Sequence, residues 1–443
     1  MKPRVLVVDD DAGVRYTLRE ILESSDIDVA EAADGVEALS WLQGNRADLL
    51  ITDLMMPNLD GMKLLERLKA IPQAPKVIML TAHGSERHAV QAIKLGACDY
   101  FSKPFDADQV MRVVERAVAA VRMQEENEQL RAELLLSRHM VFTSDAMKRV
   151  ALLVYRVAPR NVSVLITGPS GTGKERVADA IVAGSPRAAA PFVRFNCAAV
   201  PRELAEAELF GHARGAFTGA VKARIGLFRE ANGGTLLLDE VGEIDLATQG
   251  KLLRALQEGY IRPVGEDREV KVDVRVVAAT NRDLKQEVSA GRFREDLFYR
   301  LNVVEIALPP LRDRADDIPP LIDHFLRKFT ERFGTGSVTL SAPLRQALCV
   351  GSWQGNVREL EHRIERMVAL SSGGVIDDET LTVQEESKEA GDGFGLKEKV
   401  EAFERGLILQ ALREYGGNRS ETARRLGIGR VTLLDKMKKY GIE

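Results

Sequence analysis

The stretch Gly168-Pro169-Ser170-Gly171-Thr172-Gly173-Lys174-Glu175 directly follows the short apolar run Val164-Leu165-Ile166. Its glycines allow the backbone to curl until the N–H groups surround a phosphate at the start of a helix, and Lys174 can reach the terminal phosphates of a nucleotide. The strict pattern has serine or threonine after the lysine, whereas Glu175 here lacks that hydroxyl ligand for Mg²⁺. The stretch predicts a strand, a phosphate-binding loop (P-loop) and a helix, and all eight residues are candidate nucleotide contacts.

A second, acidic motif supports the nucleotide prediction. Leu236-Leu237-Leu238 is another apolar run, and it ends in Asp239 and Glu240. Asp239 can hold Mg²⁺, while Glu240 can orient or deprotonate an attacking water molecule. With a further apolar run at 274–278, residues 140–310 are predicted to form an α/β domain that hydrolyses ATP with Mg²⁺.

Residues 1–105 alternate apolar runs, at 5–8, 49–51, 77–80 and 100–101, with helix-length segments. Runs this short predict buried parallel strands in a doubly wound α/β sheet. Polar residues end the runs, and the carboxyl ends of parallel strands meet in one crevice. Carboxylates that crowd together there repel one another unless a divalent cation neutralises them, and such a site suits Mg²⁺. The residues expected to converge are Asp9, Asp10, Asp53, Thr81 and Lys103.

Length and composition set limits on the whole chain. Its 443 residues predict three or four domains, and a composition with 45% hydrophobic and 29% charged residues is that of folded globular protein. No apolar run approaches the roughly 18 residues that span a bilayer, and the first residues do not resemble an export signal, so we expect a cytoplasmic protein without a membrane partner. The three cysteines, Cys98, Cys197 and Cys349, are expected to be buried thiols.

From residue 107 the pattern becomes helical and strongly charged. Apolar side chains recur every three or four residues, which predicts a signalling helix whose segment 121–139 forms a coiled-coil linker with a second copy of the chain. The alternative is one long amphipathic helix that packs on its own domain. The residues of this stripe are Val110, Val114, Ala117, Val121, Asn127, Leu130 and Leu134.

The last part of the chain differs in composition. Glycine-rich and acidic sequence predicts a flexible linker over 376–394, and two short helices joined near Gly427 predict a helix-turn-helix within 395–443. Residues 413–443 contain eight Lys and Arg against four Asp and Glu, although the whole chain carries a net charge of −4. We expect this segment to bind double-stranded DNA, and the alternative is a helical dimerisation module. The candidate DNA contacts are Arg419, Arg424, Arg430, Thr432 and Lys436.

Residues 1–120 resemble the receiver domain of two-component response regulators. Asp53-Leu54-Met55-Met56-Pro57 and Lys103-Pro104-Phe105 complete the match. The resemblance implies a flavodoxin-like fold and phosphorylation of Asp53 by a cognate sensor histidine kinase. The other implied roles are Mg²⁺ binding by Asp9 and Asp10, phosphoryl contacts by Thr81 and Lys103, and an aromatic switch at Tyr100.

Residues 140–375 resemble the AAA+ domain, with its helical lid, of bacterial enhancer-binding proteins of the nitrogen regulatory protein C (NtrC) type, in which glutamate is common at the position of Glu175. The resemblance implies that Asn196 senses the nucleotide and restrains Glu240. It implies that Asn281, in a sensor I motif, and Arg358, in a sensor II motif, reach the nucleotide. Arg294 and Arg300 match arginine fingers that act across subunits, which implies a homodimer that assembles into a hexamer or heptamer ring.

The hexapeptide Gly215-Ala216-Phe217-Thr218-Gly219-Ala220 is identical to the loop with which this family engages sigma-54, and residues 395–443 resemble its Fis-like DNA-binding domain. The chain is therefore expected to be an α/β multidomain, phosphorylation-controlled activator. It would hydrolyse ATP in a ring to convert closed complexes of sigma-54 RNA polymerase into open complexes. The rival hypotheses are a phosphorylation-regulated DNA-binding repressor with a vestigial ATPase and a remodeller of some other protein.

Overall fold

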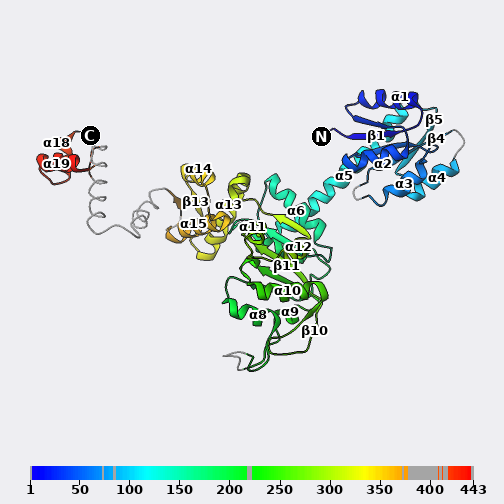
Figure 1. Ribbon diagram of the computed structural model, residues 1–443. Coiled ribbons are helices and arrows are strands. Elements are labelled where there is room, and N and C mark those ends of the chain that lie inside the picture. Colours follow the sequence, from blue (N-terminus) through cyan, green and yellow to red (C-terminus); the bar gives the residue numbers. More distant parts are fainter. Residues whose placement is uncertain are drawn as a thin grey trace. The chain divides into compact units, whose positions relative to one another are not determined.

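The computed structural model describes residues 2–71, 74–82, 86–216, 222–371, 374–377, 408, 412 and 418–440 (Figure 1). The chain divides into two compact units. The first consists of residues 1–140, 145–168 and 173–308, and the second of residues 141–144, 169–172 and 309–443. None of the helices in these described ranges is both long enough and apolar enough to cross a membrane.

The N-terminal part of the first unit is a five-stranded parallel sheet in the order β2-β1-β3-β4-β5, as in flavodoxin-like folds. Its strands are β1 (Arg4–Val8), β2 (Asp28–Ala32), β3 (Leu49–Asp53), β4 (Lys76–Ala82) and β5 (Asp99–Lys103). The helices between them are α1 (Ala12–Glu23), α2 (Gly35–Gly44), α3 (Gly61–Leu68) and α4 (Glu86–Leu95). The four apolar runs form strands, as predicted. They do not reveal β2, because this edge strand contains the charged residues Asp28 and Glu31.

Helices cover both faces of this sheet, because successive strand residues point to opposite sides. Leu6 and Val8 of β1 belong to one apolar cluster, which also contains Leu64 of α3. Val5 belongs to a second cluster, together with Leu18 of α1. Both faces are therefore buried, which is why the strands read as continuous apolar runs.

Helix α5 (Ala107–Ser137) continues from this domain without a break for 31 residues. Val110 and Val114 are fully buried, and with Ala117 they belong to the same apolar cluster as Val5. For this part of the predicted stripe the alternative is correct, because these side chains pack on their own domain.

The second half of α5 packs on α6 (Asp145–Val157), and there Ala132 and Leu136 are fully buried. Leu130 and Leu134 face away from this contact and are 58% and 57% exposed. Pairing of segment 121–139 with a second copy therefore stays a prediction, and it concerns these two exposed leucines.

The central part of the first unit is a second five-stranded parallel sheet, in the order β12-β6-β11-β8-β7. Its strands are β6 (Val164–Thr167), β7 (Phe192–Asn196), β8 (Thr235–Asp239), β11 (Arg275–Thr280) and β12 (Val304–Ala307). The surrounding helices are α6, α7 (Lys174–Ala183), α8 (Arg202–Phe210), α9 (Leu227–Glu230), α10 (Leu246–Glu258), α11 (Leu284–Ser289) and α12 (Glu295–Leu301), with the short 3-10 helix η1 (Val241–Glu243). β9 (Tyr260–Ile261) and β10 (Val270–Lys271) form a separate antiparallel pair. The three predicted runs form β6, β8 and β11.

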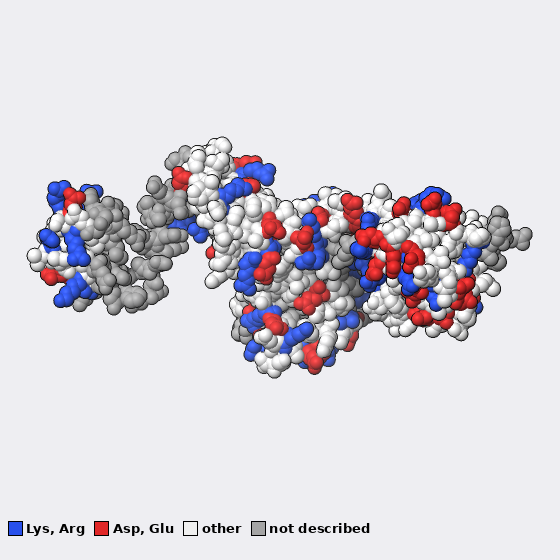
Figure 2. All heavy atoms as spheres, turned by 90° about the horizontal axis from the view of Figure 1, so that it is seen from above, with Lys and Arg blue, Asp and Glu red and all other residues white. Residues whose placement is uncertain are grey.

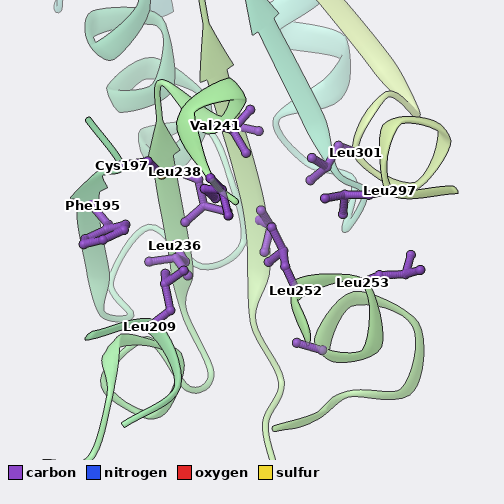
Figure 3. Packing of buried hydrophobic residues seen from close by; sticks show 14 of the residues in the cluster. Phe195, Cys197, Leu209, Leu236, Leu238, Val241, Leu252, Leu253, Leu297 and Leu301 are labelled. Carbon is purple, nitrogen blue, oxygen red and sulfur yellow. The ribbon is translucent and has the colours of Figure 1, made fainter. Parts of the chain in front are cut away.

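Figure 3 shows the apolar core beside this central sheet. Leu236 and Leu238 of β8 point to the same face, since they are two residues apart. They share one cluster with Phe195 of β7, Leu252 of α10 and Leu297 of α12. This packing fixes the carboxyl end of β8, where Asp239 and the following residue carry the acidic motif.

Two glycines form the base of the loop that contains Gly215–Ala220. His212 and Arg224 exchange backbone hydrogen bonds of 3.0 Å in both directions. Gly211 and Gly226 lie back to back beside this bridge with φ angles of +84° and +80°. A Cβ atom on Gly226 would lie 2.3 Å from the backbone nitrogen of Gly211, so no other residue fits there. Of the hexapeptide, Gly215 and Ala216 are described, whereas residues 217–220 lie outside the described residues.

The second unit contains a helical lid. It consists of the 3-10 helix η2 (Leu311–Asp317), α13 (Ile318–Phe333), α14 (Ala342–Val350) and α15 (Asn356–Leu370). A short strand β13 (Val338–Leu340) pairs in parallel with β14 (Gly374–Ile376). This corrects the predicted boundary of the flexible linker, because Ile376 is buried in the apolar core of the lid. Residues 378–394 of that linker lie outside the described residues.

The C-terminal module contains the predicted pair of short helices, α18 (Arg419–Arg425) and α19 (Arg430–Tyr440). The Asn418 side chain accepts hydrogen bonds from the first backbone N–H groups of α18 and so caps it. Gly427 adopts a φ of +66° in the turn. Leu433 and Met437 of α19 pack against Ala423 of α18 in one buried cluster.

The three cysteines differ in exposure. Cys197 is buried, Cys349 is half-buried and Cys98 is exposed. Burial, together with the charge of Asp239, raises the pKa of the Cys197 thiol. The prediction of three buried thiols is wrong for Cys98, because this residue lies in the turn before β5 rather than within a strand.

We expect Gly226→Ala to disrupt the base of the loop, because the added methyl group meets backbone atoms that no side-chain rotation can move. Gly233→Ala is the matched control, since Gly233 has a similar φ of +78° but open space around its Cα. Gly233→Ala should lower the free energy of unfolding by only about 1–2 kcal/mol, because alanine is disfavoured in a left-handed backbone conformation. Hydrogen exchange of peptides covering 208–228, read by mass spectrometry, measures the effect. Equal hydrogen-exchange protection in Gly226→Ala and Gly233→Ala would show that the steric clash at Gly226 does not determine the structure of the loop base.

Candidate functional site

Three carboxylates meet at the carboxyl edge of the N-terminal sheet. Asp9 and Asp10 follow β1, and Asp53 ends the neighbouring strand β3. One carboxylate oxygen from each lies within 4.8 Å of the others, and Asp9 is fully buried. The structure thus brings together the residues that the convergence of parallel strands predicts. A site with a small number of carboxylate oxygen ligands fits Mg²⁺.

Lys103 at the end of β5 neutralises part of this charge. Its Nζ lies 2.7 Å from Asp9 and 3.2 Å from Asp53. Burial raises the pKa of Asp53; the charge of Lys103 opposes this and that of Asp9 adds to it. Burial also disfavours the charged form of Lys103, but its hydrogen bond to Asp9 and the charge of Asp53 outweigh this and raise its pKa. Lys103 is therefore a cation held beside the carboxylate of Asp53.

The two remaining residues of this predicted set lie on neighbouring strands. Thr81 is buried on β4, where it pairs in register with Ser102 of β5. Tyr100 lies on β5, with its side chain exposed. The peptide bond between Lys103 and Pro104, at the end of β5, is cis. Thr81 is thus at the same carboxyl edge as the acids, whereas Tyr100 is at the surface.

In the central domain, Lys174 begins α7 and is buried. Gly168 and Gly173 flank the tip of the P-loop with φ angles of +147° and +103°, which a side chain rarely permits. The Nζ of Lys174 donates to the carbonyl of Gly168 at 3.0 Å and lies 3.7 Å from Glu240. The lysine is therefore drawn back across its own loop and points toward the acidic motif.

Glu240 follows β8 in a left-handed conformation, with φ of +52° and ψ of +48°. This turns its carboxylate toward β11, where it accepts a hydrogen bond of 3.1 Å from the backbone N–H of Asn281. Burial raises the pKa of the neighbouring Asp239; the charges of Glu240 and Glu175 add to this, and Lys174 opposes it. Crowded carboxylates of this kind fit a site for a divalent cation.

Asn196 lies at a different place from the one that its resemblance implies. Its amide nitrogen is 3.4 Å from Asp239 rather than in contact with Glu240. The cause is strand register, because Asn196 of β7 is paired directly with Asp239 of β8. Glu240 is one residue farther and turns away toward Asn281. Restraint of Glu240 by Asn196 is therefore not the arrangement in this structure.

Within the second unit, the sensor II motif forms hydrogen bonds with the tip of the P-loop, residues 169–172. The Asn356 side chain donates to the carbonyl of Ser170 at 2.9 Å, and the backbone N–H of Val357 donates to that of Gly171 at 3.1 Å. Asn356 is buried with a positive φ of +54°. Arg358 is exposed, and its guanidinium lies 3.3 Å from the hydroxyl of Ser170. The sensor II motif thus contacts the P-loop through three consecutive residues.

Comparison with known proteins identifies each part of the chain. A model of the sigma-54 interaction domain matches residues 140–307, and a model of the response regulator receiver domain matches 5–115. Models of the AAA+ ATPase lid domain and of bacterial regulatory proteins of the Fis family match 312–393 and 399–440. The chain is 42% identical to the regulatory protein AtoC of Escherichia coli (strain K12), over 99% of this chain and 98% of that protein.

The chain is a sigma-54-dependent response regulator of the NtrC family. It is 40% identical to the DNA-binding transcriptional regulator NtrC of Escherichia coli (strain K12), over 99% of both chains. The crystal structure of NtrX from Brucella abortus is similar over 100% of both chains, with a TM-score of 0.55 and 36% identity. NtrX in complex with ATP has a TM-score of 0.52 and 35% identity. This NtrC-family regulator is thus a phosphorylation-regulated activator with a AAA+ ATPase domain and a DNA-binding domain.

The two predicted finger arginines of this NtrC-family regulator are exposed. Arg294 forms a pair of hydrogen bonds with Asp296, of 3.0 and 2.8 Å. Arg300 donates to the backbone carbonyl of Leu256 at 2.7 and 3.1 Å. Both guanidinium groups therefore lie at the surface of the chain, held by partners that are close to them in the fold.

The DNA-binding module of the regulator is basic over its described residues 418–440, which contain seven Lys and Arg against two Asp and Glu. Figure 2 shows these basic side chains at its surface. Of the five candidate contacts, four are exposed and Lys436 is half-buried. Arg430 and Thr432 begin α19, the second helix, whose start reads base edges in helix-turn-helix proteins.

Sequence reasoning missed two residues at the P-loop. Asn356 stands inside the sensor II motif, yet only Arg358 is singled out there by resemblance. Arg314 of η2 belongs to none of the motifs, although its Nη2 donates to the carbonyl of Thr172 at 2.8 Å. The sequence signal for Asn356 is its residue type, because an asparagine, here directly after Gly355, tolerates a left-handed backbone. No pattern in the sequence distinguishes Arg314 from its neighbours.

We expect Asp53→Asn to stabilise the receiver when Mg²⁺ is absent. Folding raises the pKa of Asp53, so the protein loses stability as the pH rises from the unfolded-state pKa through the raised folded-state pKa, when the buried carboxyl ionises. Added Mg²⁺ should stabilise the wild type more than Asp53→Asn, because a ligand at ten times its Kd stabilises the protein that binds it by about 1.4 kcal/mol. Hydrogen exchange of peptides from residues 2–106 isolates the receiver. Asp108→Asn, an exposed change on α5, is the control. Equal Mg²⁺ responses in wild type and Asp53→Asn would contradict the site.

Proposed function

We propose that this regulator hydrolyses ATP with Mg²⁺ in a ring of subunits, and that the reaction converts closed complexes of sigma-54 RNA polymerase into open complexes. The observation that carries the proposal is the setting of Glu240. Its carboxylate accepts from the N–H of Asn281 at 3.1 Å and lies 3.7 Å from Nζ of Lys174. A glutamate held in this way can orient or deprotonate an attacking water molecule.

The neighbouring residues would bind the nucleotide. Asp239 would hold Mg²⁺, which neutralises charge on the phosphates when bound. Lys174 would exchange the carbonyl of Gly168 for the terminal phosphates, because an ammonium group forms stronger bonds with anionic oxygens. Asn196 lies at Asp239 and is suited to position that carboxylate. Arg358 would contact the nucleotide from the sensor II motif, as the family resemblance implies.

Hydrolysis would require neighbouring subunits. Arg294 and Arg300 are exposed, always charged and six residues apart, so either can be presented to a phosphate held by another copy. The stripe that contains Leu130 and Leu134 supports a homodimer as the first step of assembly, because both side chains are more than half exposed. A hexamer or heptamer ring would then bring the fingers to the next active site.

Phosphorylation of Asp53 by a sensor histidine kinase would control this assembly. The three acids would hold Mg²⁺, and Lys103, 3.2 Å from Asp53, would pair with the new phosphoryl oxygens. Thr81 would donate its hydroxyl to the same group. Tyr100, exposed on β5, would report the change at the surface as the family's switch aromatic.

The product of this machinery would be an open promoter. The loop Gly215–Ala220 would contact sigma-54, and its glycine base fixes where the loop leaves the domain. The basic module would hold the ring at an upstream site on double-stranded DNA, with phosphate and base contacts. The candidates are Arg419, Arg424, Arg430, Thr432 and Lys436. A repressor with a vestigial ATPase is the alternative, but the intact group of Lys174, Glu240 and Asn281 favours hydrolysis.

Subunits with complementary defects should restore activity when mixed. Arg300→Ala removes a finger and Glu240→Gln removes the group that activates water, so each protein alone should lose on the order of 10³-fold or more in ATPase rate. In a mixed ring, some interfaces would combine an intact finger with an intact glutamate. Phosphate release by mixed rings of proven assembly measures this. Persistent inactivity would place Arg300 in its own subunit's site.

Thr218→Ala should separate hydrolysis from its use. The side chain is short and neutral, so its loss should leave phosphoryl-transfer catalysis within several-fold of wild type while removing contact with sigma-54. Permanganate footprinting of a sigma-54 promoter, beside a phosphate-release assay, measures both activities. Lys222→Ala, an exposed change just after the hexapeptide, is the control. Normal promoter melting by Thr218→Ala would exclude the loop from the mechanism, and equal loss of both activities would assign it to ring assembly.

A further inference from the structure

The lid donates hydrogen bonds to three consecutive carbonyl groups of the P-loop, and the third donor lies outside every nucleotide motif. After Ser170 and Gly171, the carbonyl of Thr172 accepts from Nη2 of Arg314 at 2.8 Å. This bond is buried. Because the N–H groups of a P-loop bind phosphate on its inner side, bonds to its carbonyls fix the loop from the outer side.

Arg314 is a buried charge with incomplete pairing. Its side chain is 1% exposed, and Nη1 lies 3.9 Å from the carboxylate of Asp317. Nε is buried and makes no hydrogen bond with any residue that the structure describes. Helix η2 is interrupted at this residue, with φ of −140° and ψ of +51°. A buried ion pair of this quality adds little stability and is often replaceable by apolar residues, so stability does not explain why an arginine is there.

Asp317 connects Arg314 to the segment that leads into the ATPase domain. It is fully buried and accepts hydrogen bonds from the backbone N–H groups of Thr143 at 2.6 Å and Ser144 at 2.7 Å. The Ser144 hydroxyl donates a third bond at 3.0 Å. In the chain these two residues follow helix α5, which ends at Ser137. The carboxylate of Asp317 therefore contacts both Arg314, which binds the P-loop, and the segment that follows α5.

We infer that Arg314 and Asp317 are positioning residues of the nucleotide site, which fix the P-loop at Thr172 and tie it to Thr143 and Ser144. This inference rests on the proposed binding of nucleotide at the P-loop. Thr172 is two residues before Lys174, so a shift at its carbonyl changes the curl of the loop that binds the phosphates. Movement of segment 143–144 would displace Asp317, then Arg314, then the loop. Nucleotide affinity thus depends on the position of the segment that follows the signalling helix.

Titration of the full-length protein with fluorescently labelled ADP tests the role of Arg314. Arg314→Met keeps most of the side-chain volume without a donor, and we expect roughly tenfold or weaker binding, since a buried charged hydrogen bond contributes that much. Arg314→Lys keeps one donor and should recover part of the affinity. Arg345→Met is the matched control, because it removes a lid arginine paired with Asp323 at 2.8 Å, away from the P-loop. Its affinity should be that of wild type.

Thermal unfolding with and without ADP distinguishes positioning from a purely structural role. Positioning predicts that ADP raises the unfolding midpoint of Arg314→Met less than that of wild type. Unchanged ADP affinity, with the midpoint lowered equally in both conditions, would overturn the inference. Failure of wild-type protein to bind ADP would instead refute the proposed nucleotide site, and the inference with it.

A double-mutant cycle tests the tie to the connecting segment. Ser144→Ala removes one donor to Asp317 and should weaken ADP binding roughly two- to threefold by itself. In the Arg314→Met background it should have no further effect, because the path to the P-loop is already broken. Additive losses, or no loss with Ser144→Ala in the wild-type background, would show that Asp317 does not connect the segment to the nucleotide site.

Discussion

Parallel pairing of strands is the constraint on which both chemical sites of this regulator depend. In a parallel sheet the carboxyl ends of neighbouring strands lie at the same edge, so polar residues that end them are forced together. In the receiver this places Asp53 beside Asp9 and Asp10, and in the ATPase domain it places Asn196 opposite Asp239. Backbone hydrogen bonds and packed apolar faces hold these acids close, although the carboxylates themselves repel one another.

In both sites a lysine partly offsets the repulsion between the carboxylates. Burial raises the pKa of Asp53 in the receiver and of Asp239 in the ATPase domain, and a lysine opposes the shift in each case. Lys103 reaches its acids across the sheet, whereas Lys174 reaches Glu240 across its own loop. In the receiver, one lysine cannot neutralise the three clustered carboxylates, and so that site retains a capacity for a further cation. The chemistry differs, but the electrostatic problem is shared.

Much of this architecture is predictable because it depends on local patterns. Buried strands appear as apolar runs, and helix starts and phosphate loops follow fixed spacings. The edge strand β2 is not visible in this way, because it contains the charged residues Asp28 and Glu31. Contacts such as Asn196 with Asp239 depend on register between strands that are 43 residues apart in the chain, and Arg314 contacts Thr172 across 142 residues. The exposure of Cys98 likewise depends on where a turn falls.

Helix α5 contains neither glycine nor proline in its 31 residues. It spans about 46 Å and, being continuous, transmits a twist applied at one end to the other. Each residue advances the helix by about 100°, so deletion of seven residues would leave the two ends within about 20° of their present relation, whereas deletion of five would rotate one end by about 140°. Changes in the length of α5 should therefore disturb signalling least where they preserve this angle between its two ends.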